Sequence, residues 1–306
     1  MDFPISHAHI SLAWLVVLGF VVGVFGGIFG VGGSFLAGPA LFGLGVPMNF
    51  VVGTDLAHIV GKSIVAARNH GRLGNVDLKL AGVMVTGTII GVECGAQVIQ
   101  YLKKMSRVDL IVGCSFIFVL VAMAGFMAWE SWKTIKMTRG KRNTTGASAR
   151  KRDFSAFRHV AAKIQALGLP PYINLPVSGI KRISVWSIVI VSLVGGFFSG
   201  FLGGGAGYIR MPSMIYLLGV PTHVAVGTDL FEIIISAGYG TLSHALKGNV
   251  DIIIALVMHT GGAIGAQIGA NLTKYLAGVW IRVAFVPLPL IGAGIILHGL
   301  LHGHRP

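Results

Sequence analysis

Long apolar runs, separated by short polar turns, occupy most of the chain. A run of about 20 residues can cross the hydrocarbon core of a bilayer as a helix. Runs of roughly this length lie at residues 10–29, 47–67, 78–102, 108–129, 183–202, 222–242, 252–276 and 281–301. The pattern therefore predicts an all-α, polytopic membrane protein.

A shorter apolar segment follows the first long run in each part of the chain. One covers residues 34–44, and the other surrounds Pro212. A helix of about 11 residues is roughly 16 Å long, so it cannot cross a core of about 30 Å unaided. Each segment follows a glycine cluster, and glycine destabilises the interior of a helix. We therefore expect a broken or short helix after a glycine-rich turn in each part.

The two parts of the chain repeat one pattern. Residues 53–56 (GTDL) recur at 227–230, and residues 74–77 (GNVD) recur at 248–251. Self-similarity over a long stretch indicates a duplicated unit, which has to be recognised before the fold is interpreted. We interpret the chain as two homologous halves of about five helical segments each, at residues 1–130 and 183–306, joined by a linker at 131–182.

An odd number of segments in each half leaves two topologies open. The halves are inverted if each short segment carries the chain across the membrane, and parallel if the short segments are re-entrant. We favour inversion, with the linker inside and the N-terminus outside. The absence of Lys and Arg before the first apolar run suits this placement, because basic residues concentrate on the cytoplasmic side.

Glycines recur every four or five residues along the predicted helix at 78–102. Small residues at such spacing let two helix backbones approach closely within a membrane. We therefore expect a helix-packing face formed by Gly82, Gly87, Gly91 and Gly95.

The composition supports a membrane protein and locates most of its charge. Hydrophobic residues make up 54% of the chain and charged residues 11%, against about 25% charged in soluble domains. The net charge is +14, and 12 of the 24 Lys and Arg residues lie between Ser131 and Arg182. A basic loop between membrane spans is typical of the cytoplasmic side, so we expect no nucleic-acid partner.

Residues 154–167 have the pattern of a basic amphipathic helix on an anionic membrane surface. A partly disordered linker is the alternative.

Six Asp, Glu, Lys and Arg residues lie well inside the predicted membrane segments, away from the segment ends. Such groups cost at least a few kcal/mol at membrane depth, so they usually face a cavity or a partner and mark a transport pathway. They are Asp55, Lys62, Glu93, Arg210, Asp229 and Glu232. The alternatives are an ion pair between helices or a side chain that reaches the membrane surface.

Asp55 and Asp229 occupy the same position in the two repeats. Each follows Gly-Thr near the expected start of a helix, where a carboxylate can cap free N–H groups instead of serving transport. Asp229 and Glu232 are three residues apart on one helix face, where their like charges repel. We treat Glu93 and Glu232 as candidates for proton coupling.

The two glycine breaks are the stronger candidates for substrate binding. A broken helix exposes N–H groups that attract anions, and breaks at matching positions of two repeats indicate a transporter's binding site. The planar guanidinium of Arg210 suits an oxyanion. The candidate substrate-binding residues are Gly30, Gly32, Gly33, Pro39, Thr54, Asp55, Lys62, Gly203, Gly204, Gly205, Arg210, Pro212, Thr228 and Asp229. We expect no metal site and no cofactor, because His, Asp and Cys do not cluster at ligand spacing.

The doubled GGG, P, GVP and GTDL pattern resembles the TauE/SafE family of sulfite exporters. The resemblance covers residues 11–102 and 185–301. It implies a secondary transporter that exports small sulfur oxyanions, such as sulfite or organosulfonates, across the bacterial inner membrane. The family more commonly has GTS where this chain has Asp55 and Asp229, and the long basic insert is a further departure.

Two other functions stay open at this point. One is a cation or metal carrier that uses Asp55, Asp229 and Glu232. The other is a membrane scaffold or sensor whose basic linker binds anionic lipid or a partner. An enzyme is not expected, because no nucleophile and base stand together. The expected partners are a small anion, the lipid bilayer and a second copy of the chain in a homo-oligomer.

Overall fold

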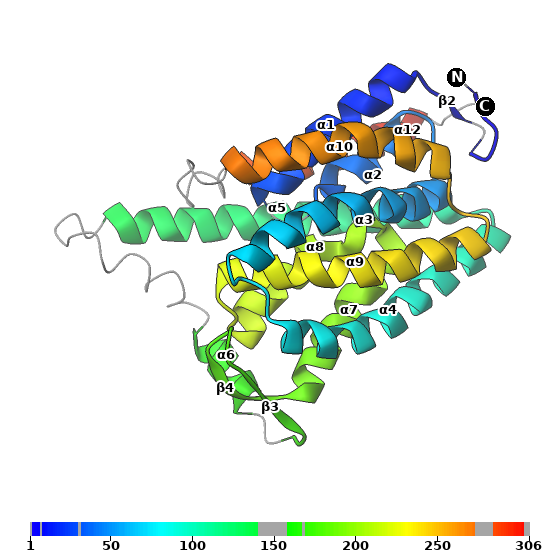
Figure 1. Cartoon of the computed structure of the whole chain (residues 1–306). Coiled ribbons are helices and arrows are strands. Elements are labelled where there is room, and N and C mark those ends of the chain that lie inside the picture. The colour runs from blue at the N-terminus through cyan, green and yellow to red at the C-terminus, as the bar shows by residue number, and fades with distance from the viewer. Residues whose placement is uncertain are drawn as a thin grey trace.

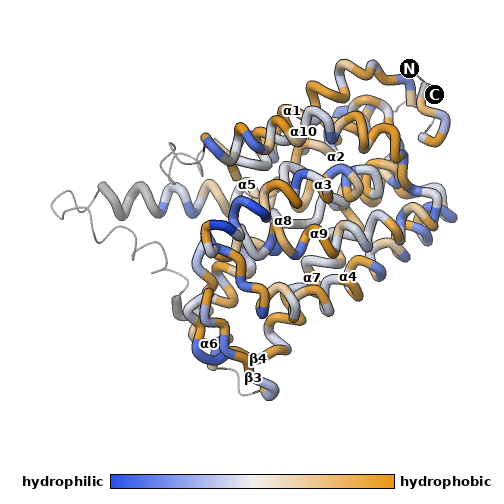
Figure 2. The backbone as a smooth tube through the Cα atoms, in the orientation of Figure 1, coloured by the Kyte–Doolittle hydropathy of each residue, from blue (hydrophilic) through white to orange (hydrophobic). Residues whose placement is uncertain are grey.

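The computed structural model describes residues 2–6, 8–29, 32–139, 158–166, 169–272 and 284–302. Within these ranges, six helices are long and apolar enough to cross a membrane, which confirms the all-α polytopic fold. They are α1 (Leu12–Phe29), α3 (Met48–Arg72), α4 (Leu78–Lys104), α5 (Val108–Arg139), α7 (Val185–Leu202) and α10 (Ile252–Leu272). Two further helices complete the bundle, α9 (Thr222–Leu246) and α12 (Pro287–His302). Hydrophobic positions dominate the helices, and hydrophilic positions gather mainly at their ends (Figure 2).

Both predicted short helices are present, and each follows a glycine turn. In the first half, Gly32 and Gly33 have positive φ angles of 75° and 76°, and α2 (Ser34–Gly43) follows them. In the second half, Gly203, Gly204 and Gly205 have positive φ angles, a backbone region that glycine adopts without steric cost. This turn includes the 3₁₀ segment η2 (Gly204–Ala206) and leads into α8 (Gly207–Ser213) and the π-helical turn η3 (Met214–Leu218). Gly30 lies outside the described residues.

Rows of glycine pack two pairs of helices backbone to backbone. The row Gly87, Gly91 and Gly95 of α4 lies against the backbone of α7. A matching row in α10, Gly261, Gly265 and Gly269, lies against α1. Residue numbers rise together along both contacts, so the helices of each pair run parallel. The predicted packing face is confirmed except at Gly82, which has no neighbour within 4 Å of the position where a Cβ would lie.

Reciprocal hydrogen bonds show how the central helices α3 and α9 are oriented. Near the start of α3, the Thr54 hydroxyl accepts a 3.0 Å hydrogen bond from the Asp251 N–H, just beyond the end of α9. Near the start of α9, the Thr228 hydroxyl accepts a 3.0 Å bond from the Asp77 N–H, just beyond the end of α3. The start of each helix therefore lies beside the end of the other, and α3 and α9 are antiparallel (Figure 1). The corresponding helices α3 and α9 therefore run in opposite directions, as the inverted topology requires. The duplication and the domain boundaries stay predictions from the sequence.

Two small β-hairpins, which the sequence patterns did not predict, lie at opposite ends of the molecule (Figure 1). In each hairpin, a serine between the two strands hydrogen-bonds the aspartate that precedes a helix. Between the first pair of strands, the Ser6 hydroxyl donates a 2.7 Å hydrogen bond to Asp251, and between the second pair Ser178 does the same to Asp77. The strands are β1 (Asp2–Phe3) and β2 (Ala8–His9), and β3 (Tyr172–Leu175) and β4 (Ile180–Ser184).

The linker contains a helix that is shorter than the predicted one and contacts protein. This helix, α6 (Arg158–Gln165), packs against η3, and the Gln165 side chain donates a 2.8 Å hydrogen bond to the Leu218 carbonyl. Ala161 is buried at this contact. Part of the predicted amphipathic helix is therefore present and contacts protein on one side, whereas its contact with lipid stays a prediction. Residues 154–157 and 167 lie outside the described residues.

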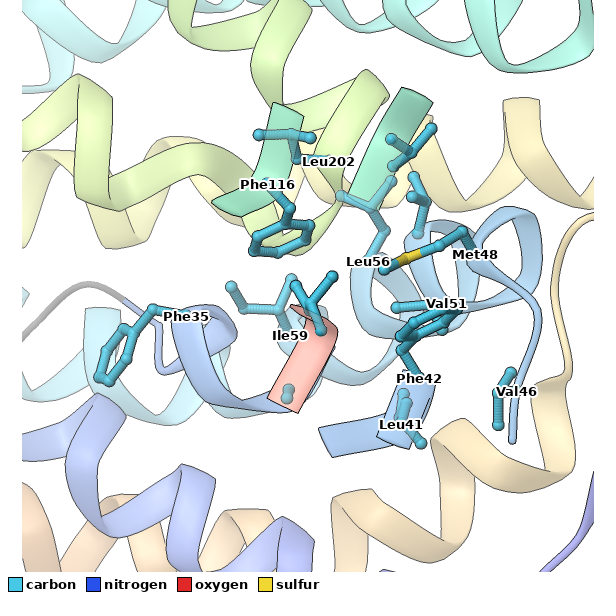
Figure 3. Close-up of a cluster of buried hydrophobic side chains, with 14 of the residues drawn as sticks. Phe35, Leu41, Phe42, Val46, Met48, Val51, Leu56, Ile59, Phe116 and Leu202 are labelled. Carbon is cyan, nitrogen blue, oxygen red and sulfur yellow. The ribbon is translucent and has the colours of Figure 1, made fainter. Parts of the chain in front are cut away.

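The core anchors the short helix α2 to the rest of the bundle. Phe35 and Phe42 of α2 are buried with Leu56 and Ile59 of α3 and with Phe116 of α5 (Figure 3). Fully burying a large apolar side chain contributes about 1.5–3 kcal/mol in a soluble protein, and within a membrane close packing supplies the corresponding stabilisation. The start of α2 is thereby fixed beside α3, where the charged residues lie.

Candidate functional site

The two glycine breaks meet at the centre of the molecule. The Ser34 hydroxyl, at the start of α2, donates a 3.0 Å hydrogen bond to the carbonyl of Gly204. At Gly204 itself, a Cβ would collide with the side chain of Ser34 and would lie 2.9 Å from a carboxylate oxygen of Asp55. At Gly203, a Cβ would lie 2.9 Å from the carbonyl oxygen of Val52 in α3. Glycine at these positions thus allows both breaks to converge on one face of α3.

A fully buried ion cluster lies in the second half of this centre. Arg210 of α8 donates from Nε to Asp229 Oδ1 at 2.5 Å, and its Nη1 lies 2.5 Å from Glu232 Oε2. All three side chains have no exposed surface. Ser236 adds a hydrogen bond of 3.1 Å to Glu232. Two carboxylates therefore neutralise the guanidinium, although its Nη2 has no hydrogen-bond partner among the described residues.

A second charged group lies in the first half, and its members are unpaired. Asp55 and Lys62 are buried, as is His58 between them on the same face of α3. Neither carboxylate oxygen of Asp55, the Nζ of Lys62 nor either ring nitrogen of His58 has a hydrogen-bond partner among the described residues. An unpaired buried polar group costs roughly 1–3 kcal/mol, and more when it is charged. Such a group is the type that a bound ligand satisfies.

The prediction that Asp55 and Asp229 cap helices is wrong. Each is the eighth residue of its helix, because α3 begins at Met48 and α9 at Thr222. A cap must lie at the first turn, where N–H groups are free. The bundle places both carboxylates two turns deeper, in the buried centre.

The residues that do cap helices are Asp77 and Asp251, in the turns before α4 and α10. Asp77 Oδ1 accepts a hydrogen bond of 3.2 Å from the Leu80 N–H, and Asp251 Oδ1 accepts one of 3.3 Å from the Ile254 N–H. The sequence contained this signal, since both residues end a GNVD turn just before an apolar run. Thr54 and Thr228, at corresponding positions of α3 and α9, accept hydrogen bonds from the N–H groups of these same aspartates and so have a structural role.

Three other predicted residues lie apart from the charged centre. Glu93 is about one-third exposed and belongs to a peripheral cluster with Lys247 at 2.9 Å and the Ser243 hydroxyl at 2.6 Å. The structure therefore does not bring this coupling candidate to the site. Pro39 lies inside α2 and packs against Gly292 of α12, and Pro212 lies inside α8.

Two histidines at the centre were missed by the sequence reasoning. His58 faces His259 of α10, with ring centroids 6.4 Å apart. The signal for His58 was its spacing, three residues after Asp55 and four before Lys62, which places all three on one helix face. No residue pattern indicates that α10 packs beside α3, so His259 could not be placed in advance.

The charges of the centre favour a small ion as ligand. Two cationic and three acidic side chains are buried there: Lys62, Arg210, Asp55, Asp229 and Glu232. Within the described ranges, no three His, Cys, Asp or Glu side chains converge as metal ligands. The arrangement can hold an ion through charge and hydrogen bonds.

Oppositely oriented sets of helices, with two broken helices that meet at a buried charged centre, define a class: this is a multi-pass membrane transporter. The family model described as sulfite exporter TauE/SafE matches residues 15–295, so the chain belongs to that family.

Curated relatives cover nearly the whole chain. A probable membrane transporter protein of Bacillus subtilis, YunE, is 25% identical over 95% of this chain and 99% of its own length. YdhB, from the same organism and with the same description, is 24% identical over 92% of this chain and 98% of its own. A probable membrane transporter protein of Methanocaldococcus jannaschii is 22% identical over 89% of this chain and 90% of its own length. No solved structure matches the chain significantly.

Proposed function

We propose that this protein is a permease that moves small oxyanions, such as sulfite or an organosulfonate, across the bacterial inner membrane. The observation that carries the proposal is the meeting of both glycine breaks beside buried Lys62 and Arg210. The start of α2 adds free N–H groups, and the partial positive charge of a helix N-terminus favours an anion. No catalytic step is part of the proposal.

The ion cluster around Arg210 supplies a means of proton coupling. Two carboxylates neutralise the guanidinium and therefore oppose the binding of an anion to Arg210. A proton on Glu232 removes one of these negative charges and weakens its attraction to Arg210, which frees N–H donors for an oxyanion. Binding of a proton would thus favour binding of the anion at the same centre, which is the reciprocal coupling that a symporter needs.

A second candidate is a carrier for monovalent cations. The excess of three acidic over two basic side chains at the centre favours it, together with the unpartnered carboxylate of Asp55. A scaffold or sensor role is tested by deleting residues 140–157, which contain several basic residues of the linker but no part of α5, α6, β3 or β4. A transporter should retain flux after this deletion, whereas a scaffold or sensor should lose its partner.

The test is sulfite flux in proteoliposomes, with and without a pH gradient. We expect wild-type flux to increase with the gradient, and Arg210→Ala and Asp229→Asn to lower it by about tenfold or more, because a hydrogen bond to a charged group contributes about 1.5–3 kcal/mol. Arg182→Ala removes an exposed arginine of β4 and serves as the matched control. Thermal unfolding in detergent shows whether each variant is folded.

A different flux pattern would contradict the anion proposal. Absence of sulfite and sulfonate flux in the wild type, together with cation flux that is lost in Asp229→Asn, would replace the anion proposal with the cation carrier.

A further inference from the structure

The two halves of the centre are chemically unequal. At the repeat offset of 173 residues, Arg210 corresponds to Ala37. At the offset of 174 residues, Glu232 corresponds to His58, and Ser236 corresponds to Lys62. Arg210 forms ion pairs with Asp229 and Glu232, although Nη2 of Arg210 and one oxygen of each carboxylate have no hydrogen-bond partner among the described residues. In the other half, Asp55 and Lys62 form no ion pair within 4.0 Å, and their polar atoms have no hydrogen-bond partner in the described part of the chain.

The unpaired side chains comprise both donors and an acceptor. Lys62 Nζ is a donor, and each His58 ring nitrogen can donate or accept according to its protonation. Both Asp55 oxygens are acceptors without a hydrogen-bond partner. No ion pair within 4.0 Å joins Asp55 to Lys62 among the described residues, because seven residues of helix separate their backbones by about 10 Å.

We propose that the substrate binds at Asp55, His58 and Lys62, as a singly charged oxyanion that also carries its own hydrogen-bond donor. Lys62 and His58 bind the anionic oxygens, and Asp55 accepts the donated hydrogen bond. The inference rests on the proposed function and specifies which oxyanions that function includes. A ligand of this kind satisfies donors and acceptor together, which a fully ionised oxyanion without a donor cannot do.

The geometry limits the size of the ligand. All three side chains project from one face of α3 within two helical turns, and all are buried, which favours a small ligand. His259, half-buried beside His58, borders the cluster on the side of α10.

The test compares 2-hydroxyethanesulfonate with ethanesulfonate, which differ by one hydroxyl. Their kcat/KM values are measured in proteoliposomes with purified full-length protein. We expect the wild type to prefer the hydroxylated compound by about tenfold or more, since a site built to hydrogen-bond a hydroxyl rejects the analogue that lacks it. Asp55→Ala should bring the two values within about twofold of each other while ethanesulfonate is still carried. Lys62→Met should lower both by about tenfold or more.

Controls separate this inference from the function on which it depends. Lys103→Met removes an exposed lysine at the end of α4 and should preserve both rates and the preference. If Asp55→Ala proves unstable, Asp55→Asn provides a second readout, because its amide can also donate and should weaken the preference. Equal wild-type rates for both compounds, or an unchanged preference in folded Asp55 variants, would overturn the inference and leave oxyanion transport intact. Failure of the wild type to carry any sulfonate or sulfite would instead overturn the proposed function.

Discussion

Two aspartates at matching turns hold the halves of the molecule together. Asp77 caps α4, receives Ser178 from the second hairpin and donates its N–H to Thr228 of α9. Asp251 makes the corresponding contacts with α10, Ser6 and Thr54. Each aspartate thus connects a helix start, a hairpin and the central helix of the other half.

Replacing such an aspartate should destabilise the fold without changing ligand recognition. We expect Asp77→Ala to lower the free energy of unfolding by about 1–2 kcal/mol through loss of the cap, with some further loss from Ser178. Thermal unfolding in detergent measures the effect, and Asp251→Ala should show one of similar size. A large change in sulfite KM with unchanged stability would contradict this structural role.

Glycine determines how closely the helices of each pair approach. Gly91 of α4 faces the backbone of Leu193 and Phe197 in α7, whereas Gly82 on the same helix faces open space. The identical substitution should therefore have opposite effects at the two positions. The bundle depends on these contacts because apolar helices gain little hydrophobic stabilisation from leaving lipid.

We expect Gly91→Ala to destabilise the protein by about 1–3 kcal/mol, because the added methyl group forces α4 and α7 apart. Gly82→Ala should be neutral or stabilise by up to about 1 kcal/mol, since alanine has the higher helix propensity. Thermal unfolding of the two variants side by side provides the measurement. Equal effects would show that close contact at Gly91 is not required.

Helices were largely predictable from the sequence, and their contacts were not. Apolar length predicted the long helices, and glycine with proline predicted α2 and α8. Arg210, Asp229 and Glu232 were each recognised as charges at membrane depth. Their mutual pairing depends on how α8 packs on α9, which no local pattern specifies. The strands β3 and β4 were missed because their short, mixed sequence carries no clear alternation.

At the scale of the whole molecule, the corresponding helices α3 and α9 run in opposite directions. The turn between α3 and α4 lies at the end that holds the β3–β4 hairpin, and the turn between α9 and α10 lies at the end with β1 and β2 (Figure 1). The positive-inside rule predicts the basic linker on the cytoplasmic side, and on that prediction the first turn faces the cytoplasm and the second faces outward.

This orientation can be tested with single cysteines. In a background that lacks Cys94 and Cys114, we expect an impermeant maleimide to label Leu246→Cys in intact cells, and Leu73→Cys only after permeabilisation. Both positions are exposed ends of corresponding helices, with exposed fractions of 82% and 67%. Labelling of both positions from the same side would support parallel halves instead.

The ion cluster around Arg210 affects the relative free energies of the inward-facing and outward-facing forms. In a transporter built from two inverted copies, inward-facing and outward-facing forms arise when the halves exchange conformations, and identical halves would make these forms equal in energy. Here a fully buried ion pair ties α8 to α9, while α2 has Ala37 at the corresponding place. Separating α8 from α9 therefore costs more free energy than separating α2 from α3. We expect the empty carrier to favour either the inward-facing or the outward-facing form, by roughly tenfold for each 1.4 kcal/mol that the ion pair contributes to that form.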